Sequence, residues 1–523
     1  MTQTRKPGTA EPQDGPVDKW WTLVAVCLGT FMLLLDVTII NVALPDIQDA
    51  LGSSFAGLQW IIDAYALTLA ALLLTAGSLA DLYGRRRLYV LGLGLFTAAS
   101  LLCGFATSTL MLQVSRGLQG VGGAIMFAVS LALLAGAFRG KDRGTAFGIW
   151  GATTGLAVAL GPLLGGILTT GLSWRWIFFI NLPFGLFAAF ITLTKVAESR
   201  APTAKRPDWV GFAVFTTALS LLVFGLIESN QRSLTDTLVV GSVLLAVALL
   251  GLFVLVELRG EHPMFDLALF AKPTFSGGAI AAFGLSSTLF AMLLYLTLYL
   301  QNVLGFSALG TGVRLVILSG GILVTSAITG RLSSHVPVRL LIGPGLALVG
   351  IGLLLMRGLD AGSSWTHLVP GLIVAGIGAG MINPPLASTA VGVVEPERAG
   401  MASGINSTFR QVGIATGIAL LGTLFGSRVA TSIAAGVAGN PDLGSRGGDI
   451  ALAVQTGKVG ELTASLPPQL RETVGTLART AFTDGLDRIL LLGAIGALLS
   501  AVSAFFLIRQ KDFVSQGGPS AGH

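Results

Sequence analysis

The chain has 523 residues, of which 53% are hydrophobic and only 11% are charged, with a formal net charge of +6. Soluble globular domains carry roughly 25% charged residues, so this composition excludes an ordinary soluble protein and indicates a membrane protein. The basic residues are scattered through short segments between apolar runs and form no single basic face, which argues against binding to nucleic acid.

Apolar runs begin after a polar tail of 19 residues, and each is long enough to cross a hydrocarbon core of ~30 Å. They predict an all-α polytopic membrane protein with fourteen transmembrane helices. The expected spans lie at about 20–44, 56–80, 88–106, 111–136, 145–170, 174–195, 208–229, 236–258, 275–301, 307–330, 339–357, 367–394, 400–426 and 487–509.

Arg and Lys are concentrated in every second connecting segment, as at Arg85, Arg86 and Arg87. Because positive charge resists translocation in short loops, this asymmetry predicts that both termini lie in the cytoplasm of a plasma-membrane protein. The stretch 427–486 is expected to be an extracytoplasmic loop, with a short amphipathic helix around 468–480.

An internal repeat relates the first six spans to the last six, at an offset of roughly 253 to 256 residues. Duplication predicts two six-helix bundles with two inserted helices, an arrangement of 6+2+6. The expected divisions are a cytoplasmic tail 1–19, an N-terminal bundle 20–200, the inserted pair 201–260, a C-terminal bundle 261–510 and a second cytoplasmic tail 511–523.

Three charged residues lie inside apolar runs of the first bundle, namely Asp36, Asp63 and Arg116. A charge in this position costs about 3 kcal/mol on insertion scales and usually faces a cavity. Counted from the outer helix ends, all three lie at ~8 to 12 Å depth. We therefore predict that they couple transport to protons, without assigning the proton to either aspartate. The alternative is a fixed salt bridge of Arg116 that only orients helices.

The segment between the second and third spans contains small residues, an aspartate and arginines in close succession. Asp81 can accept hydrogen bonds from Arg85 and Arg86 and face the N-terminus of a neighbouring helix, while Gly77 and Gly84 allow close packing and a tight turn. The alternative is a set of anchors that only fix the orientation in the membrane.

The fifth span contains Gly151 and Gly155, followed by Gly161, Pro162 and Gly165. Small residues four apart allow close helix packing, and Pro162 favours a bend. We predict a bend and a tight seal between the two bundles, with helix packing alone as the alternative.

Polar residues elsewhere in the spans are candidates to line a central cavity and bind substrate. They are Asn41, Gln59, Tyr65, Gln113, Gln119, Tyr295, Asn383, Asn406 and Arg410. The run Met381 to Pro385 contains two prolines, so it is expected to open its helix locally.

These motifs resemble the major facilitator superfamily, specifically its fourteen-helix drug/proton antiporter branch. The segment Gly77 to Arg87 is similar to the family's loop motif, Leu35 to Pro45 to its first-helix signature, Arg116 to Gly120 to its fourth-helix motif and Gly151 to Gly166 to its antiporter motif. The resemblance implies that Gly77, Asp81, Gly84, Arg85 and Arg86 form a latch on the cytoplasmic side that controls closure between the bundles. It also implies that Arg116 takes part in proton transfer, and that the protein is an antiporter. Acids found in later helices of some members are replaced here by Arg314 and Arg410, which favours neutral, monocationic or anionic cargo.

The predicted function is proton-coupled export of small hydrophobic or amphiphilic drugs or natural products, by a monomer among membrane lipids. The alternatives are an exporter of an endogenous lipid or metabolite, a nutrient symporter, and a membrane enzyme or receptor. The spans contain no histidine except His367 at the very start of one of them, and no phosphate-binding loop, so we expect neither an enzyme nor a metal site, and no cofactor beyond the proton gradient.

Overall fold

The computed structural model describes residues 18–53, 55–200, 208–229, 235–260, 265–333, 335–438, 443 and 446–513, and this part of the chain consists of helices and their connecting segments, without strands. The α-helices are α1 (Asp18–Leu51), α2 (Phe55–Tyr83), α3 (Arg85–Gly104), α4 (Thr109–Ala137), α5 (Gly140–Gly171), α6 (Trp176–Phe179), α7 (Asn181–Lys195), α8 (Trp209–Glu228), α9 (Thr237–Arg259), α10 (Pro273–Leu285), α11 (Ala291–Leu298), α12 (Ala308–Leu332), α13 (Arg339–Leu355), α14 (Val369–Gly392), α15 (Ala399–Val437), α17 (Gly447–Thr456), α18 (Val459–Ser465) and α19 (Pro468–Leu507). Two π-helical segments, Ser286–Phe290 and Tyr299–Val303, continue α10 and α11 as one rod.

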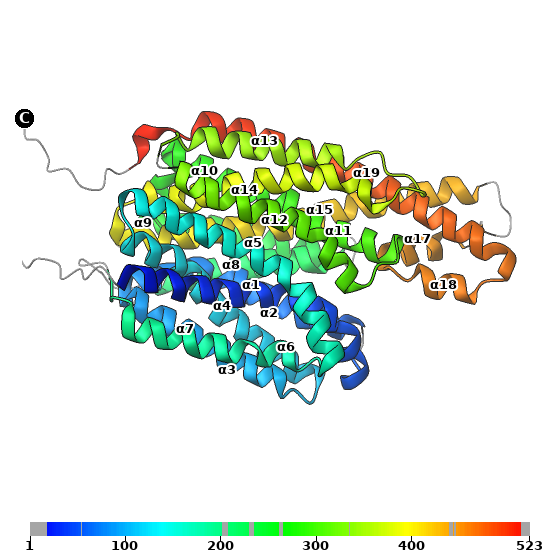
Figure 1. Ribbon diagram of the computed structural model, residues 1–523, viewed down its shortest axis with the longest axis horizontal. Helices are drawn as coiled ribbons and strands as arrows, with labels where there is room; N and C mark the ends of the chain where they lie inside the picture. The colour runs from blue at the N-terminus through cyan, green and yellow to red at the C-terminus, as the bar shows by residue number, and fades with distance from the viewer. Residues whose placement is uncertain are drawn as a thin grey trace, which may run out of the picture.

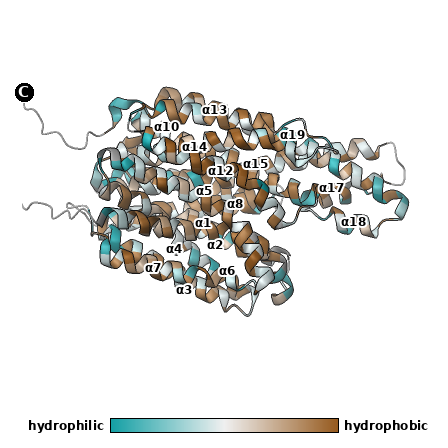
Figure 2. Cartoon of the chain, in the orientation of Figure 1, coloured by the Kyte–Doolittle hydropathy of each residue, from teal (hydrophilic) through white to brown (hydrophobic). Residues whose placement is uncertain are grey.

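Apolar side chains cover the outside of the helix bundle as well as its interior. Leu244, Leu186 and Phe506 are among many large hydrophobic residues that are more than half exposed, and hydrophilic residues gather at the two ends of the bundle (Figure 2). A surface of this kind is stable only in lipid, where backbone groups must be satisfied within helices.

Twelve of the described helical spans are long and apolar enough to cross a membrane. The helix α5 is bent by 43° between Asp142–Val158 and Leu163–Gly171. If its two parts are counted together as one span, α5 adds a thirteenth. The bend expected near Pro162 is therefore present. The helix α13, with 17 residues, is apolar but shorter than the others.

The helices pack as two sets that meet along two seams. Helices α1 to α7 pack on one another, and α10 to α15 pack with α19. The sets meet where α5 lies along α12 and where α2 lies along α15, while α8 and α9 pair with each other and α8 also contacts α2 and α15 (Figure 1). We call the two sets the first half and the second half.

The described ends of the chain lie at one end of the bundle, where α1 begins and α19 ends (Figure 1). We call this the terminal end and the opposite one the distal end. At the terminal end Lys19 on α1 forms an ion pair of 2.7 Å with Asp142 on α5. The ring of Phe513 lies beside Gly392, the last residue of α14.

A helical extension projects from the distal end, and the described residues of the stretch 427–486, expected to be a loop with one short helix, are largely helical. The helices α15 and α19 have 39 and 40 residues, about 60 Å each at 1.5 Å per residue, twice the ~30 Å of a hydrocarbon core. With α17 and α18 they form the extension seen in Figure 1. The short helix expected at 468–480 is the beginning of α19. Apolar residues such as Val429, Ile433 and Val474 are buried and explain why both helices continue.

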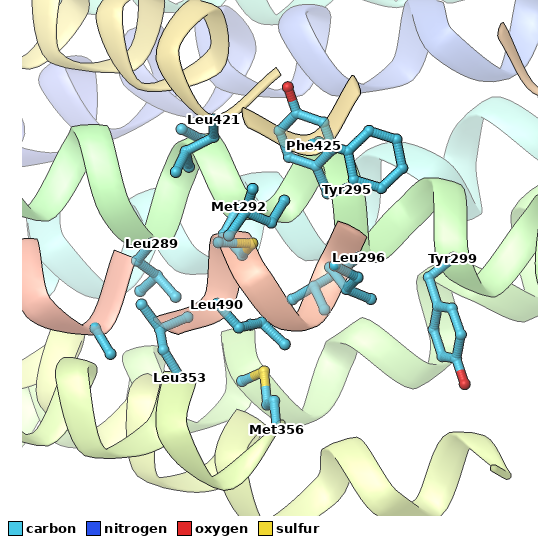
Figure 3. Packing of buried hydrophobic residues seen from close by; sticks show 14 of the residues in the cluster. Leu289, Met292, Tyr295, Leu296, Tyr299, Leu353, Met356, Leu421, Phe425 and Leu490 are labelled. Carbon is cyan, nitrogen blue, oxygen red and sulfur yellow. The ribbon is translucent and has the colours of Figure 1, made fainter. Parts of the chain in front are cut away.

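The hydrophobic core of the second half continues into this extension. Tyr295 on α11 contacts Phe425 on α15, with ring centroids 5.5 Å apart, and Phe425 contacts Phe482 on α19 at 5.0 Å. Figure 3 shows Tyr295 and Phe425 beside Leu421, and Leu296 beside Leu490. This packing joins the distal parts of three helices.

The helix α14 is continuous across Pro384 and Pro385, so the expected local opening does not occur. Proline removes one backbone donor and frees the carbonyl four residues earlier. The freed carbonyl of Gly380 accepts a hydrogen bond from Ser326 Oγ at 3.3 Å. A neighbouring helix thus satisfies the group that was expected to face a cavity.

Candidate functional site

Asp36 on α1 and Arg116 on α4 form an ion pair in the interior of the first half. Each residue is only 1% exposed. Gln119 lies three positions after Arg116, on the same face of α4, and its Nε2 donates to Asp36 Oδ1 at 2.8 Å. Arg116 Nη1 also donates to Gln119 Oε1 at 2.8 Å. The guanidinium of Arg116 and the amide of Gln119, both on α4, therefore hydrogen-bond the same carboxylate on α1.

A further donor to Asp36 comes from α7. Asn181 Nδ2 donates to Asp36 Oδ1 at 3.1 Å and to Ser100 Oγ on α3 at 3.0 Å, and Ser100 Oγ donates to Phe178 O at 2.9 Å. Sequence reasoning missed Asn181 and Ser100. Asn181 could have been identified from the sequence, because it is the single amide side chain in the sixth apolar run. Ser100 could not, because serine is common in transmembrane helices.

The guanidinium of Arg116 lies over the ring of Tyr65, with 4.2 Å from Cζ to the ring centroid, and its Nε donates to Ile61 O at 3.3 Å. A cation over an aromatic face is stabilised by the ring quadrupole, most strongly where water is excluded. Tyr65 is 3% exposed. Its place is therefore under Arg116, rather than on the wall of an open cavity as expected.

Asp63 is absent from this network, although its depth on α2 suggested that it would join. It is half-buried, and its Oδ2 is buried without a hydrogen-bond partner among the described residues. The charge that acts on it is Glu228, the last residue of α8. Trp60 on α2 contacts Phe224 on α8 nearby, with ring centroids 6.0 Å apart. The rotation of α2 therefore turns Asp63 toward α8, and no hydrogen bond or ion pair between described residues joins it to Arg116.

The remaining candidate substrate residues do not converge on one point. Gln113 Nε2 donates to Gly57 O at 3.0 Å, and Tyr295 donates to Ile418 O at 3.0 Å, so both tie helices together. Arg410 on α15 donates to Asn383 on α14 at 2.8 Å. Asn406 is 6% exposed, one helical turn before Arg410.

Two further candidate substrate residues are Gln59 and Asn41. Gln59 is half-buried on α2. The side chain of Asn41 lies outside the described part of the chain.

At the terminal end, the motif at Asp81 joins the two halves. Asp81 accepts hydrogen bonds from the backbone N–H groups of Gly400 and Met401 at 3.0 and 2.9 Å, and from Arg85 at 2.9 and 2.8 Å. Arg85 Nη2 also donates to Pro396 O at 2.5 Å. A Cβ on Gly77 would overlap the carbonyl oxygen of Gly400. Three of the five predicted closure residues, Gly77, Asp81 and Arg85, therefore contact the start of α15 or the segment before it.

Gly84 and Arg86 serve a different contact within the first half. Gly84 has φ of 110°, a conformation that L side chains rarely adopt, at the turn between α2 and α3. Arg86 N donates to Glu198 Oε1 at 3.1 Å, and Arg86 Nη2 donates to Leu193 O at 2.5 Å. These contacts fix the turn to the end of α7 rather than to the second half.

The glycines of α5 divide between two partners. Gly151 and Gly155 face the second half, where an added Cβ would lie 3.2 Å from Pro384 Cγ and 3.1 Å from Ile322 Cγ2. Gly161 and Gly165 instead face α1, at Thr38 and Ile39. The expected seal between halves is therefore misplaced for Gly161 and Gly165, whose close packing lies within the first half. The side chain of Pro162 lies outside the described part of the chain.

The seam between α5 and α12 is completed by glycines nearer the terminal end. Gly144 and Gly148 on α5 meet Gly330 on α12 so closely that a Cβ on Gly330 would overlap the backbone of α5. Among the described residues, no group of three or more His, Cys, Asp or Glu side chains could hold a metal ion.

Comparison with known proteins agrees with this architecture. The family model described as Major Facilitator Superfamily matches residues 26–418, more than half of the chain. The chain belongs to the Major Facilitator Superfamily. The solved structure of the human organic anion transporter MFSD10 (TETRAN) has a TM-score of 0.63 to this superfamily member at 16% sequence identity, covering 95% of this chain and 100% of that one. At this identity the likeness establishes the shared fold alone.

Three relatives of this superfamily member carry names of drug transport or resistance. It is 38% identical over 413 residues to the multidrug resistance protein Stp of Mycobacterium tuberculosis, covering 79% of this chain and 77% of the relative. It is 37% identical to the puromycin resistance protein pur8 of Streptomyces alboniger, covering 78% and 82%. The tetracenomycin C resistance and export protein of Streptomyces glaucescens is 32% identical, covering 93% and 91%.

These findings confirm the expected family of multidrug efflux transporters of the Major Facilitator Superfamily, and with it the all-helical fold. They support a multi-pass transporter of small molecules that exports drugs. The family is one of transporters rather than enzymes.

Proposed function

We propose that this protein is a proton-driven antiporter that exports small hydrophobic or amphiphilic compounds by alternating access of its two halves. The drug-resistance and export names of its relatives support the cargo class. In this proposal it crosses the plasma membrane fourteen times, with α5 and α13 each counted as a span and α8 and α9 inserted between six-span halves. It acts as a monomer surrounded by lipid, has cytoplasmic termini, and uses no cofactor besides the proton gradient.

The observation that carries the proposal is the buried Asp36 carboxylate. It accepts from Arg116, Gln119 and Asn181, so its oxygens act purely as acceptors, as those of an ionised carboxylate do. Protonation would remove the charge that holds Arg116 and would turn one acceptor oxygen into a donor. Because these partners lie on α4 and α7, a proton on Asp36 would loosen α1 from both helices. We therefore assign the proton to Asp36.

The closed contact at the terminal end supports the alternating-access part of the proposal. With cytoplasmic termini, the contact of Asp81 with α15 and the glycine seam of α5 with α12 lie on the cytoplasmic side. The arrangement then corresponds to a state that is closed to the cytoplasm. Export requires a second state in which these contacts separate and cargo enters.

The test is uptake of the fluorescent cation ethidium into inverted membrane vesicles whose lumen is acidified. Wild type should accumulate the dye only while the pH gradient lasts, and Asp36→Asn should abolish this uptake. Asp46→Asn is the matched control, because Asp46 lies on the same helix but is exposed to solvent. It should retain the wild-type rate.

Uptake by wild type that persists after the pH gradient is collapsed would contradict proton coupling. An unchanged rate in Asp36→Asn would remove Asp36 from the mechanism. If wild type accumulates neither ethidium nor neutral or anionic dyes, export of an endogenous lipid or metabolite becomes the better hypothesis. Elution of each variant as a single species in size-exclusion chromatography separates lost transport from lost folding.

A further inference from the structure

The guanidinium of Arg410 lies in the second half without a carboxylate to neutralise it. None of the ion pairs between described residues includes Arg410, and its single hydrogen bond among them runs from Nη2 to Asn383 Oδ1 at 2.8 Å. Its Nε is buried and has no partner in the described part of the chain. Arg116 in the first half differs, because Asp36 balances its charge.

Arg410 also lies near the middle of the membrane. It follows the first residue of α15, Ala399, by eleven positions, which is about 17 Å of helix at ~1.5 Å per residue. Asn383 lies nine positions before the end of α14, about 14 Å by the same measure. Both depths are close to half of a hydrocarbon core of ~30 Å. An uncompensated charge at this depth is costly unless something it binds compensates for it.

The pair lies on helices that face the first half. Pro384, next to Asn383, is the residue that a Cβ on Gly151 of α5 would meet at 3.2 Å. Gly404, six positions before Arg410, is packed against Leu73 and Leu74 of α2. Both α14 and α15 also contact α4. Since cargo in this fold crosses between the halves, Arg410 and Asn383 are well placed to meet it.

The chemistry of the pair selects the ligand. A guanidinium presents five N–H donors and no acceptor, so it binds carboxylates, sulfonates and phosphates, often through two donors at once. Asn383 is 2% exposed and holds one edge of the guanidinium, which fixes the direction of the remaining donors. Arg410 itself is half-buried and therefore still accessible in part.

We propose that Arg410 and Asn383 form the subsite that recognises an anionic group on the exported amphiphile. The inference rests on the proposed export function and predicts that, within its cargo, an amphiphile that carries a carboxylate, sulfonate or phosphate is preferred over its neutral analogue. The anion supplies the missing counter-charge while the apolar remainder of the cargo contacts the surrounding helices.

The experiment compares two dyes that share one skeleton in proteoliposomes with a pH gradient. 1-Anilinonaphthalene-8-sulfonate carries the anionic group, and N-phenyl-1-naphthylamine is the same molecule without it. Wild type should transport the sulfonate in preference to the neutral dye. In Arg410→Gln the ratio of the two rates should fall roughly tenfold, as expected when one charge-assisted hydrogen bond is lost, while Arg410→Lys should keep most of the preference.

Asn383→Asp is the decisive second variant. It keeps a hydrogen-bond acceptor beside Arg410 but adds an internal anion that competes with the cargo, so it should also lower the ratio. A purely structural role for the Arg410–Asn383 hydrogen bond predicts no such loss, because that bond would become stronger. Arg446→Gln removes the same charge from an exposed position in the helical extension and should keep the wild-type ratio.

An unchanged ratio in both Arg410→Gln and Asn383→Asp would overturn the subsite. Wild type that transports only the neutral dye would overturn it as well. Neither result touches the antiport proposal, which the ethidium experiment with Asp36→Asn decides separately.

Discussion

The carboxylate of Asp81 on α2 accepts the backbone N–H of Gly400 at 3.0 Å, although the two residues are 319 positions apart in the chain. Gly400 is the second residue of α15, and Met401 N donates to the other carboxylate oxygen at 2.9 Å. A negative charge is stabilised at a helix N-terminus by unpaired N–H groups and by the helix dipole. The two halves are thus joined at the terminal end by a charge–helix contact.

Replacement of Asp81 by Asn should weaken closure at the terminal end. The substitution removes the charge that Arg85 and the start of α15 both stabilise, at a cost to the closed state of about 2 kcal/mol for charge-assisted hydrogen bonds. That cost shifts the population toward the open state roughly 30-fold. Spin labels at Lys195 and Lys511, which are exposed at the terminal end of the two halves, should report a new population at longer distance.

The distance measurement needs a background without the free cysteines Cys27 and Cys103. Asp142→Asn is a suitable control, because Asp142 forms its terminal-end ion pair with Lys19 inside the first half. It should leave the distance distribution unchanged. If Asp81→Asn has the wild-type distribution too, Asp81 does not hold the closed state.

Gly77→Val should disfavour the same closed state by steric overlap. The closest atom to an added Cβ is the Gly400 carbonyl oxygen, which belongs to a helix backbone and cannot rotate away. Overpacking of this kind costs about 1 to 3 kcal/mol, and here only the closed state bears the cost. Gly94→Val on α3 is the matched control, because nothing lies within 4 Å of an added Cβ there. Ethidium uptake into vesicles is the readout, and it should be slowed in Gly77→Val and unchanged in Gly94→Val. Slowed uptake in both variants would show that the contact with Gly400 is not the cause.

Substitutions in the ion pair of Asp36 and Arg116 should affect thermal stability and transport in different ways. Loss of one partner leaves an uncompensated buried charge and costs about 3 to 5 kcal/mol, so Asp36→Asn and Arg116→Gln should each unfold at lower temperature. The double variant should recover much of that stability, because the neutral amides can hydrogen-bond. It should still fail to transport, because no proton-binding carboxylate remains. Tryptophan fluorescence during heating and vesicle uptake give the two readouts.

The double variant distinguishes the two roles weighed for this pair. A double variant that is both stable and active would mean that the pair only orients α1 against α4. Unequal protein amounts are excluded by normalising uptake to the amount of transporter in each vesicle preparation.

The orientation of the molecule is tested by labelling single cysteines in intact cells. A cysteine at Glu461, exposed on α18 of the extension, should react with a membrane-impermeant maleimide added outside. A cysteine at Lys511, exposed at the terminal end, should react only after the cells are opened. The reverse pattern would place the termini outside and would assign the Asp81 contact to the outer face.

Sequence patterns located the charged residues of the first half but not their partners. The depth of Asp36, Asp63 and Arg116 follows from counting residues along each helix, because the rise per residue is constant. Which way each side chain points depends on helix rotation, and packing against neighbours sets that rotation. Asp63 therefore shared a level with Asp36 in the sequence, yet it lies toward Glu228 and α8 in the structure.

The small-residue motif of α5 shows the same division. Glycine spacing predicted close helix contact, and every glycine from Gly144 to Gly165 with this spacing does pack closely. Spacing does not name the partner helix. Gly151 and Gly161 are ten positions apart, which places them about 80° apart around a helix of 3.6 residues per turn, and Gly151 faces the second half while Gly161 faces α1.

The sequence by itself therefore determined local features. These are the bilayer as the surrounding medium, the positions of the helices along the chain, and the charged residues inside spans that were candidates for a functional role. These follow from hydrophobicity and helix geometry, which act within a segment. Only the tertiary structure decided that Asn181 completes the Asp36 site, that α15 and α19 extend as helices beyond the distal end, and that Arg410 meets Asn383 without a counter-ion. Those features depend on which faces of distant helices meet, and packing between side chains far apart in the chain selects those faces.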